Sequence, residues 1–317
     1  MRISIVIPNV NSPIIQDVLA SIYRQTGYDQ IAEIIVVGRD EVDKIRPHPL
    51  VRLVATPKLL TPAEARNLGA ELSRGEIIIF MDSDVVLFPS TIVTLGERAG
   101  EGYIIGGSVV FETTRYWQLA GNILSFSTTA DAMPAESRDY LPTMLLALQH
   151  TIWEDVGPFN TDYKDAAGED TDWALRASRQ GYRLLFEPQA RCYHRPSRIT
   201  YSDFGVKMRQ YGAAWGQIYL SFMSGQHWNP RYTARGRLEY LRLLLWAAKR
   251  CSSAGSIVMI WIDGWIESAA LRDVLLLFVQ QAYLRRYWYT LPALLLLQRE
   301  WYRGALQILR QQSERYD

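Results

Sequence analysis

The chain has 317 residues, more than one compact domain usually contains, so one large domain with an appendage, or two domains, is expected. The two cysteines, Cys192 and Cys251, have no paired spacing. Composition therefore excludes a disulfide framework and a cysteine-based zinc site, and a reducing, cytoplasmic setting fits best. The apolar run before Pro8 is too short for a signal peptide and predicts a first buried strand.

The charges are nearly balanced overall, with 34 Lys and Arg against 33 Asp and Glu, but they are unevenly distributed. Residues 1–194 hold 17 basic and 25 acidic residues (17 − 25 = −8), whereas residues 195–317 hold 17 and 8 (17 − 8 = +9). The basic part also contains seven of the ten tryptophans. Cations combined with interfacial aromatics suit an anionic membrane surface, and nucleic acid is the alternative partner for such a tail.

The first 111 residues alternate predicted strands and helices. Apolar residues at helical spacing predict the first helix, and Thr61, Pro62 and Glu64 form a capping-box start for the second. Gly106 and Gly107 lie inside the last strand and indicate close backbone approach. The predicted strands are 3–7, 31–37, 51–55, 77–81 and 103–111, and the predicted helices are 13–25, 61–73 and 89–99.

The next part of the chain, up to His194, is harder to interpret. A helix is predicted over 116–126, and the polar, proline-containing stretch 127–142 is predicted to be a loop of the kind that can cover a site. A short helix ending at 154–159, a helix over 169–180 and two short strands follow. Those strands are 183–186 and 190–193, and His194 stands at their end.

Everything after Tyr201 is predicted to be helical, at 201–224, 234–253, 255–284 and 291–312. Two apolar stretches without charge, 251–262 and 287–298, are twelve residues each. A bilayer needs roughly 18 to 20 apolar residues, so no transmembrane helix is predicted.

The most informative stretch is the apolar run Ile77–Met81, which stops at Asp82 and Asp84. It reads as a parallel strand buried on both faces, and sites in open α/β sheets lie beyond the carboxyl ends of strands. Two carboxylates there suit a hard divalent cation shared with substrate phosphates. A solvated turn is the alternative, whereas a calcium loop is excluded because Val86–Phe88 occupy positions that need oxygen ligands.

Four blocks of sequence in this order resemble glycosyltransferase family 2, nucleotide-sugar-dependent enzymes with the GT-A fold. They are ISIVIPNVN at 3–11, AEARNLGAELSRGEIIIFMDSDV at 63–85, DVGPF at 155–159, and GEDTDWALRASRQGYRLLFEPQARCYH at 168–194. The resemblance covers roughly residues 4–194. It implies a Rossmann-like mixed α/β sheet flanked by helices over 1–200, with a helical extension over 201–317.

The resemblance also implies roles for individual residues. Asp84 would bind the metal that bridges the nucleotide diphosphate, Asp82 would lie by the ribose or the metal, and His194 would be a further metal ligand. Asp170 would be the catalytic base, with Glu169 and Asp172 hydrogen-bonded to the acceptor or to neighbours. The residues expected to face the nucleotide are Pro8, Asn9, Asn11, Arg66, Asn67, Asp82 and Ser83. Without the resemblance, the acids at 169–172 could simply complement a helix dipole.

The chemistry of sugar transfer supports these roles. A carboxylate-held Mg²⁺ or Mn²⁺ neutralises a departing nucleoside diphosphate as a Lewis acid. An aspartate, with an ordinary pKa near 3.9, is ionised at neutral pH and can accept the proton of the attacking hydroxyl.

The sequence departs from the family after the second strand, where an acidic residue usually contacts the nucleotide base. Here Gly38 and Arg39 follow Val37, and Asp40 or Asp43 could substitute. The base is therefore open: UDP-sugars are commonest in the family, and GDP- or dTDP-sugars remain candidates.

The expected function is an inverting glycosyltransferase that modifies a lipid-linked or polysaccharide acceptor at the inner membrane face. No nucleic-acid partner is expected. The C-terminal helices could instead pack as soluble core or form a homo-oligomer. A catalytically inactive carbohydrate-binding scaffold is a second possibility, and a nucleotidyltransferase is disfavoured because PNVNSPII lacks a glycine-rich, basic phosphate loop.

Overall fold

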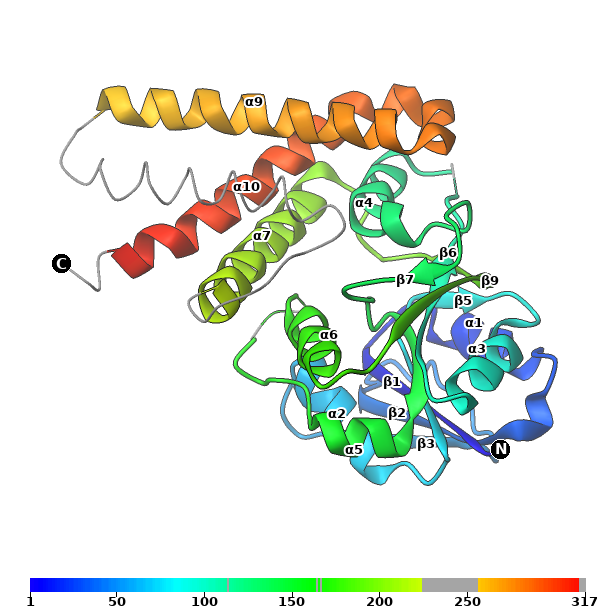
Figure 1. The fold of residues 1–317 in the computed structure, drawn as a ribbon. Helices are drawn as coiled ribbons and strands as arrows, with labels where there is room; N and C mark the ends of the chain where they lie inside the picture. The colour runs from blue at the N-terminus through cyan, green and yellow to red at the C-terminus, as the bar shows by residue number, and fades with distance from the viewer. Residues whose placement is uncertain (113, 164, 166, 224–255, 314–317) are drawn as a thin grey trace. The chain divides into compact units, whose positions relative to one another are not determined.

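The computed structural model of the chain describes residues 1–112, 114–163, 165, 167–223 and 256–313 (Figure 1). It divides into two compact units. The sheet unit contains Met1–Glu112 and Phe126–Ser197, and the helical unit contains Thr113–Ser125 and Arg198–Asp317. The helical unit therefore includes a segment from the middle of the chain as well as the C-terminal part.

The sheet unit is built on one mixed nine-stranded sheet, which confirms the predicted α/β class. The strand order is β3-β2-β1-β4-β8-β6-β9-β5, with β7 pairing with β9. Strand β1 runs parallel to β2 and β4, whereas β8 is antiparallel to β4 and β6. The strands are β1 (Ile3–Val10), β2 (Ile31–Arg39), β3 (Val51–Ala55), β4 (Ile77–Met81), β5 (Val85–Leu87), β6 (Ile104–Val109), β7 (Glu136–Ser137), β8 (Leu145–Gln149) and β9 (Leu184–His194).

Helices cover both faces of this sheet (Figure 1). On one face, Val6 and Phe80 pack in a core with Trp173 of α6. On the other face, Ile3 lies against Gly96 of α3, as the alternation of side chains along β1 requires. The helices of the sheet unit are α1 (Ile15–Tyr23), α2 (Pro62–Leu72), α3 (Thr91–Gly100), α5 (His150–Val156) and α6 (Glu169–Arg179), whereas α4 (Tyr116–Phe126) belongs, except for its last residue, to the helical unit.

The start of α2 follows the predicted chemistry. The Thr61 hydroxyl accepts a hydrogen bond from the Glu64 backbone N–H, and the Glu64 carboxylate accepts one from the Thr61 N–H, so both halves of the capping box are formed. This start fixes the first turns of the helix that carries Arg66 and Asn67.

Three predictions for the sheet unit were wrong. The two short strands expected at 183–186 and 190–193 are one strand, β9, because a register shift opposite Gly106 and Ser108 lets pairing with β6 continue past Pro188. The predicted loop 127–142 contains a 3₁₀ turn, η2 (Ser127–Thr129), and strand β7. Strands β5 and β8 were not predicted at all.

The helical unit contains α7 (Tyr201–Met223), α9 (Ser256–Gln280), the 3₁₀ segment η3 (Ala282–Thr290) and α10 (Leu291–Ser313). The predicted helix 255–284 is therefore interrupted after Gln280, and the helix predicted at 234–253 lies outside the described residues. Helices α7 and α10 approach closely, because a Cβ at Gly212 would overlap the carbonyl oxygen of Trp301. Within the described ranges, no helix combines the length and apolarity needed to cross a membrane.

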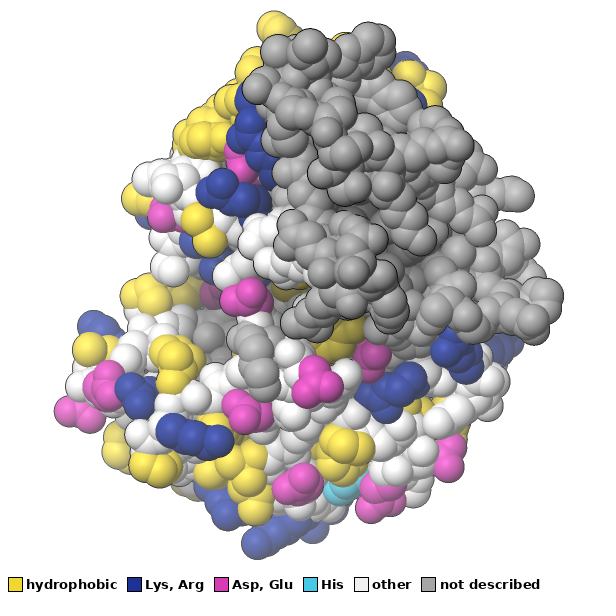
Figure 2. Space-filling model, turned by 90° about the vertical axis from the view of Figure 1, so that its left-hand side faces the viewer, with side chains coloured by type: hydrophobic (Ala, Val, Ile, Leu, Met, Phe, Trp, Pro, Cys, Tyr) yellow, Lys and Arg dark blue, Asp and Glu magenta, His cyan; other side chains and the backbone are white. Residues whose placement is uncertain are grey.

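Charged side chains of both signs are interspersed over the described part of the face that Figure 2 displays. A nucleic-acid-binding surface has basic residues clustered in a patch or stripe. The face drawn in Figure 2 has no such stripe among its described residues.

Candidate active site

The two aspartates after β4 lie where β4, β5 and β9 meet. Val85 pairs with His194 in the antiparallel ladder of β5 and β9, and the Arg195 backbone N–H donates to the Asp84 carbonyl at 2.8 Å. The loop after β1 reaches the same place, because the Ser12 hydroxyl donates to the Ser83 carbonyl at 2.7 Å. Strand pairing therefore brings together residues that are more than 100 positions apart.

Asp84 and His194 form a candidate half-site for a metal ion. The Asp84 Oδ1 and His194 Nε2 atoms are 3.6 Å apart, and the Phe126 ring packs edge-on against the imidazole, with centroids 4.8 Å apart. In the part of the chain that the structure describes, no three His, Cys, Asp or Glu side chains converge on one point. A carboxylate and an imidazole still fit Mg²⁺ or Mn²⁺, because such ions commonly complete their coordination with substrate phosphates and water.

Arg66 connects Asp82 to the first residue of α6. Its Nη2 lies 2.7 Å from Asp82 Oδ1 and its Nη1 lies 2.8 Å from Glu169 Oε1, and both Arg66 and Glu169 are almost completely buried. Burial disfavours the charge on Arg66, but Asp82 and Glu169 outweigh it and hold the arginine pKa above its ordinary value. Arg66 was expected to face the nucleotide, whereas in this structure its guanidinium joins two carboxylates.

Glu169, which is buried, and Asp170, which is half-buried, form an acidic pair at the start of α6. Burial, followed by the negative charge of Asp170, raises the pKa of Glu169 to about 7, against the opposing effect of Arg66. Burial also raises the pKa of Asp170, and the charge of Arg66 is the strongest opposing influence. An aspartate with a raised pKa is a stronger base than an exposed one, which suits proton acceptance.

Hydrogen bonds fix the orientation of the Asp170 carboxylate. It accepts from the Thr171 backbone N–H at 2.7 Å and from the Thr171 hydroxyl at 3.3 Å, and the backbone of Thr143 also acts to lower the pKa of this carboxyl group. Thr143 lies just before β8. The sequence carries no signal for this contact, since β8 itself was not predicted.

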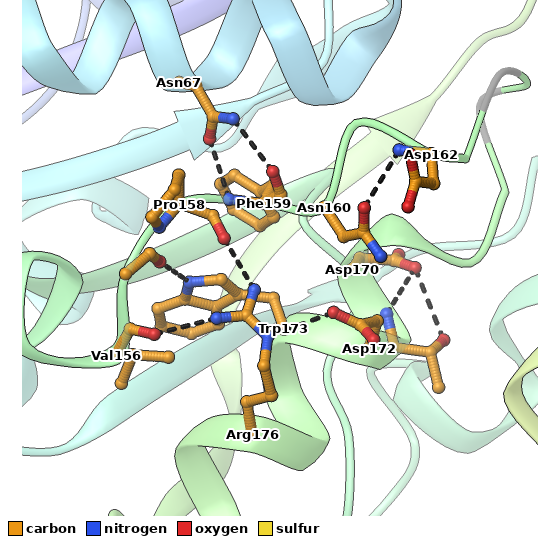
Figure 3. A network of polar contacts seen from close by, with 12 residues as sticks. Asn67, Val156, Pro158, Phe159, Asn160, Asp162, Asp170, Asp172, Trp173 and Arg176 are labelled. Carbon is orange, nitrogen blue, oxygen red and sulfur yellow. Dashed lines mark hydrogen bonds and ion pairs between the residues drawn. The ribbon is translucent and has the colours of Figure 1, made fainter. Parts of the chain in front are cut away.

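Asp172 points toward the loop formed by the DVGPF motif rather than standing alone (Figure 3). Its Oδ2 accepts from Arg176 Nε at 3.0 Å, and the Arg176 guanidinium donates to the carbonyls of Val156 and Pro158 at 2.7 and 2.6 Å. The Trp173 indole N–H donates to the Gly157 carbonyl at 2.8 Å. The motif is thus a loop tied to α6, and it holds the start of α6 against α5.

Asn67 ties the same loop to α2 (Figure 3). Its amide nitrogen donates to the Phe159 carbonyl at 2.9 Å, and its amide oxygen accepts from the Phe159 N–H at 2.8 Å. The side chain was expected to face the nucleotide, whereas the structure shows both ends of the amide bonded to the loop.

Asn9 and Asn11 join the end of β1 to the end of β2. Asn9 donates to the Arg39 carbonyl at 2.6 Å, and Asn11 donates to Glu41 Oε2 at 2.9 Å. Pro8 lies one step earlier, opposite Val37 in the ladder. This places the residues expected to face the nucleotide beside the position where the family usually carries an acidic residue.

The acids that follow β2 differ in their hydrogen-bond partners and in their exposure to solvent. Both Asp40 oxygens accept backbone N–H groups, from Lys44 and Ile45, so this carboxylate caps its own loop. Glu41 is exposed and lies against Asn11 and Arg39. Glu41 was missed in the sequence, although its position two residues after the strand end could have suggested it.

Comparisons with known proteins identify the class of protein. The model of "Glycosyl transferase family 2" matches residues 4–156. Glycosyltransferase AglE of Haloferax volcanii is 28% identical over 232 residues, which are 69% of this chain and 73% of that protein. The mannosyltransferase PcManGT of Pyrobaculum calidifontis, solved with GDP-Man and Mn²⁺, superimposes with a TM-score of 0.56 at 21% identity, covering 94% of this chain and 85% of that one.

A further solved structure, GalNAc-T7 with UDP, GalNAc and Mn²⁺, superimposes with a TM-score of 0.52 at 14% identity, covering 76% of this chain and 54% of that one. The mixed sheet and its flanking helices have the GT-A fold. Residues 4–156 form a glycosyl transferase family 2 domain, as the sequence blocks within them predicted, and the protein is a glycosyltransferase.

Proposed function

We propose that the protein is an inverting, metal-dependent hexosyltransferase that moves a sugar from a nucleoside-diphosphate sugar to a hydroxyl group of a glycan or glycolipid. One observation carries the proposal. Asp84 and His194 lie at one edge of the sheet with Asp82, and Arg66 joins Asp82 to Glu169, which precedes Asp170. A leaving-group site and a proton acceptor are thereby held by one connected set of side chains.

Each residue has a defined task in the proposed reaction. Asp84 and His194 would hold Mg²⁺ or Mn²⁺, which supplies Lewis-acid neutralisation of the diphosphate leaving group. The oxygen of the acceptor hydroxyl bonds to the anomeric carbon of the donor sugar, and the bond from that carbon to the diphosphate breaks. Asp170 accepts the proton that this hydroxyl releases. Attack from the face opposite the leaving group inverts the configuration at that carbon.

Arg66 and Glu169 position this machinery. Without a cation beside it, the buried Glu169 carboxylate would disfavour ionisation of the neighbouring Asp170, which is the proposed base. Arg66 opposes this effect at both Glu169 and Asp170, so the base can be ionised despite its burial. Asp172 and Asn67 support the site indirectly. Both hold the loop 156–159 against the helices that carry the site residues.

The donor base and the acceptor are less closely defined. A UDP-sugar is our first choice and a GDP- or dTDP-sugar is the alternative, with PcManGT solved with GDP-Man and GalNAc-T7 solved with UDP. Glu41, exposed beside Asn11, is the acid available to contact the base. We place the acceptor, a lipid-linked sugar or a polysaccharide of the cell envelope or of an extracellular glycan, at the inner face of the membrane, where the enzyme would attach peripherally.

A test of the metal role compares Asp84→Ala with Asp29→Ala, which removes an exposed carboxylate from the 3₁₀ turn η1 (Tyr28–Gln30). Sugar transfer is measured with Mn²⁺ and with EDTA. We expect Asp84→Ala to abolish metal-dependent transfer with little change in melting temperature, and Asp29→Ala to behave as wild type. Full activity of the wild type in EDTA would contradict the metal role.

A thermal-shift screen of nucleotide sugars with Mn²⁺ would identify the donor, because a ligand that binds the folded state raises the melting temperature. The same screen separates this proposal from a catalytically inactive scaffold. An inactive scaffold would bind a sugar or glycan without Mn²⁺ dependence and without turnover.

A further inference from the structure

The helical unit exposes a set of large apolar side chains. Leu271, Leu275 and Val279 recur every four residues and therefore share one face of α9. Val279 is 69% exposed and Trp288, in η3, is 68% exposed. The exposed large apolar side chains of residues 266–308 are Leu271, Leu275, Leu276, Val279, Trp288, Tyr289 and Leu296, which we call the apolar surface.

The apolar surface is not part of the core of the helical unit. The same helices bury a separate set of side chains: Tyr287, Leu294, Leu297, Trp301 and Tyr302. The Tyr302 hydroxyl also donates to Asp273 Oδ2 at 2.6 Å, which links α10 to α9. Since the unit already has a core, the exposed residues need a different explanation.

Cations stand next to the exposed aromatics, and the acids of residues 266–308 do not neutralise them. Arg285 and Arg286 are exposed in η3, and neither has an ion pair with a residue that the structure describes. Every acid of residues 266–308, by contrast, is engaged elsewhere. Glu267 pairs with Arg299 at 3.0 Å, Asp273 with Arg272 at 2.9 Å, and Glu300 with Arg303 at 2.8 Å.

We propose that the apolar surface, together with Arg285 and Arg286, docks on an anionic lipid bilayer. Leucine, valine and tryptophan side chains enter the boundary between headgroups and acyl chains, and arginine side chains reach the lipid phosphates. The inference identifies the membrane-facing residues of the proposed glycosyltransferase, and it rests on the proposed function only for its lipid-linked acceptor.

Two other occupants fit less well. In a symmetric dimer the same surface would meet its own copy, which would bring uncompensated arginines of both copies into one interface. Nucleic acid would suit the arginines and Trp288, but its interfaces are polar, and the aliphatic face of Leu275 and Val279 offers such a partner nothing. An anionic bilayer accommodates both the charge and the aliphatic area.

The test is flotation of the full-length protein with phosphatidylcholine vesicles, with and without phosphatidylglycerol. Arg285→Gln/Arg286→Gln should lower partition onto the anionic vesicles by roughly 30-fold, at about fivefold for each arginine near the surface. Val279→Ser/Trp288→Ser should lower it by about tenfold or more. The matched control is Leu53→Ser/Leu59→Ser, which removes exposed leucines from the sheet unit and should leave flotation unchanged.

Melting temperatures check that each variant is folded. We expect all of them to fold, because the substituted side chains are exposed. The proposal is overturned if the wild type does not float at low salt, or if the leucine control loses flotation as strongly as Val279→Ser/Trp288→Ser. It is also overturned if light scattering finds a dimer that Val279→Ser/Trp288→Ser dissociates while vesicle binding persists. Binding of the nucleotide sugar, measured without vesicles, distinguishes the two proposals. If only the membrane proposal is wrong, nucleotide-sugar binding remains and flotation is absent. If only the proposed enzymatic function is wrong, flotation remains and nucleotide-sugar binding is absent.

Discussion

Each unit of this protein buries one charged side chain between two of opposite sign. In the sheet unit, Arg66 lies between Asp82 and Glu169. In the helical unit, Glu300 lies between Arg209 and Arg303, and the Tyr201 hydroxyl donates to it.

The two networks differ in where they lie. The Arg66 network stands beyond the carboxyl end of β4, next to Asp170, whereas the Glu300 network lies between α7 and α10. Both networks contain buried polar atoms without a hydrogen-bond partner among the described residues: Arg66 Nε and Glu169 Oε2 in the first, Glu300 Oε2 in the second. Burial of charge alone therefore does not identify a catalytic site; the position at strand ends does.

The largest effect is expected for Asp170→Asn, which removes the proton acceptor. Sugar transfer should fall by on the order of 10² to 10⁴, with donor binding by calorimetry unchanged. Glu300→Gln is the matched change in the helical unit and should leave turnover in solution unaltered. Equal turnover of Asp170→Asn and wild type would remove Asp170 from the mechanism.

Arg66→Met should be the most destabilising change to the sheet unit. It leaves Asp82 and Glu169 without their cation, at a cost of about 3 kcal/mol, the lower end of the range for a broken buried pair, because Glu169 can take up a proton. Denaturant unfolding measures the loss. Arg303→Met is the control and should cost less, since Glu300 keeps Arg209 and Tyr201. A similar cost for both variants would contradict the contrast drawn between the two networks.

Gly212→Ala should destabilise the helical unit by about 1 to 3 kcal/mol, because the added methyl group overlaps the Trp301 carbonyl and the two helices must separate. Gly216→Ala is the control, since its Cβ would lie 3.3 Å from the nearest atom. Thermal unfolding reports the difference, and donor binding should survive in both variants. If Gly212→Ala were as stable as Gly216→Ala, the close approach of α7 and α10 would be wrong.

The last prediction concerns the dependence of stability on pH. Burial raises the pKa of Glu169 from its ordinary 4.5 to about 7, so the folded state binds this proton more tightly than the unfolded state. The stability from this group is complete below pH 4.5 and is lost as the pH rises to about 7. Glu169→Gln should flatten the stability profile across that window, measured by denaturant unfolding at several pH values. A profile identical to that of the wild type would show that Glu169 does not titrate there.

The sequence by itself determined the elements whose signals are local. The apolar run of β4 ending at Asp82 and Asp84, the capping box of α2 and the acidic start of α6 all lie where the pattern predicted. Burial of both faces of a strand, a cap and a helix dipole each depend on residues within a few positions, so they can be read without the fold. The family could be recognised for the same reason.

Only the tertiary structure decided which residues far apart in the sequence contact each other. Arg66 meets Glu169 across 103 positions and Asn67 meets Phe159 across 92, and neither pairing has a local signal. Strand β8 inserts between β4 and β6 although its sequence carries no turn signal that distinguishes it from a buried helix. In the helical unit, Trp301 is buried whereas Trp288 is exposed. Composition counts the two tryptophans alike, and only the packing of α9, η3 and α10 assigns one to the core and the other to the surface.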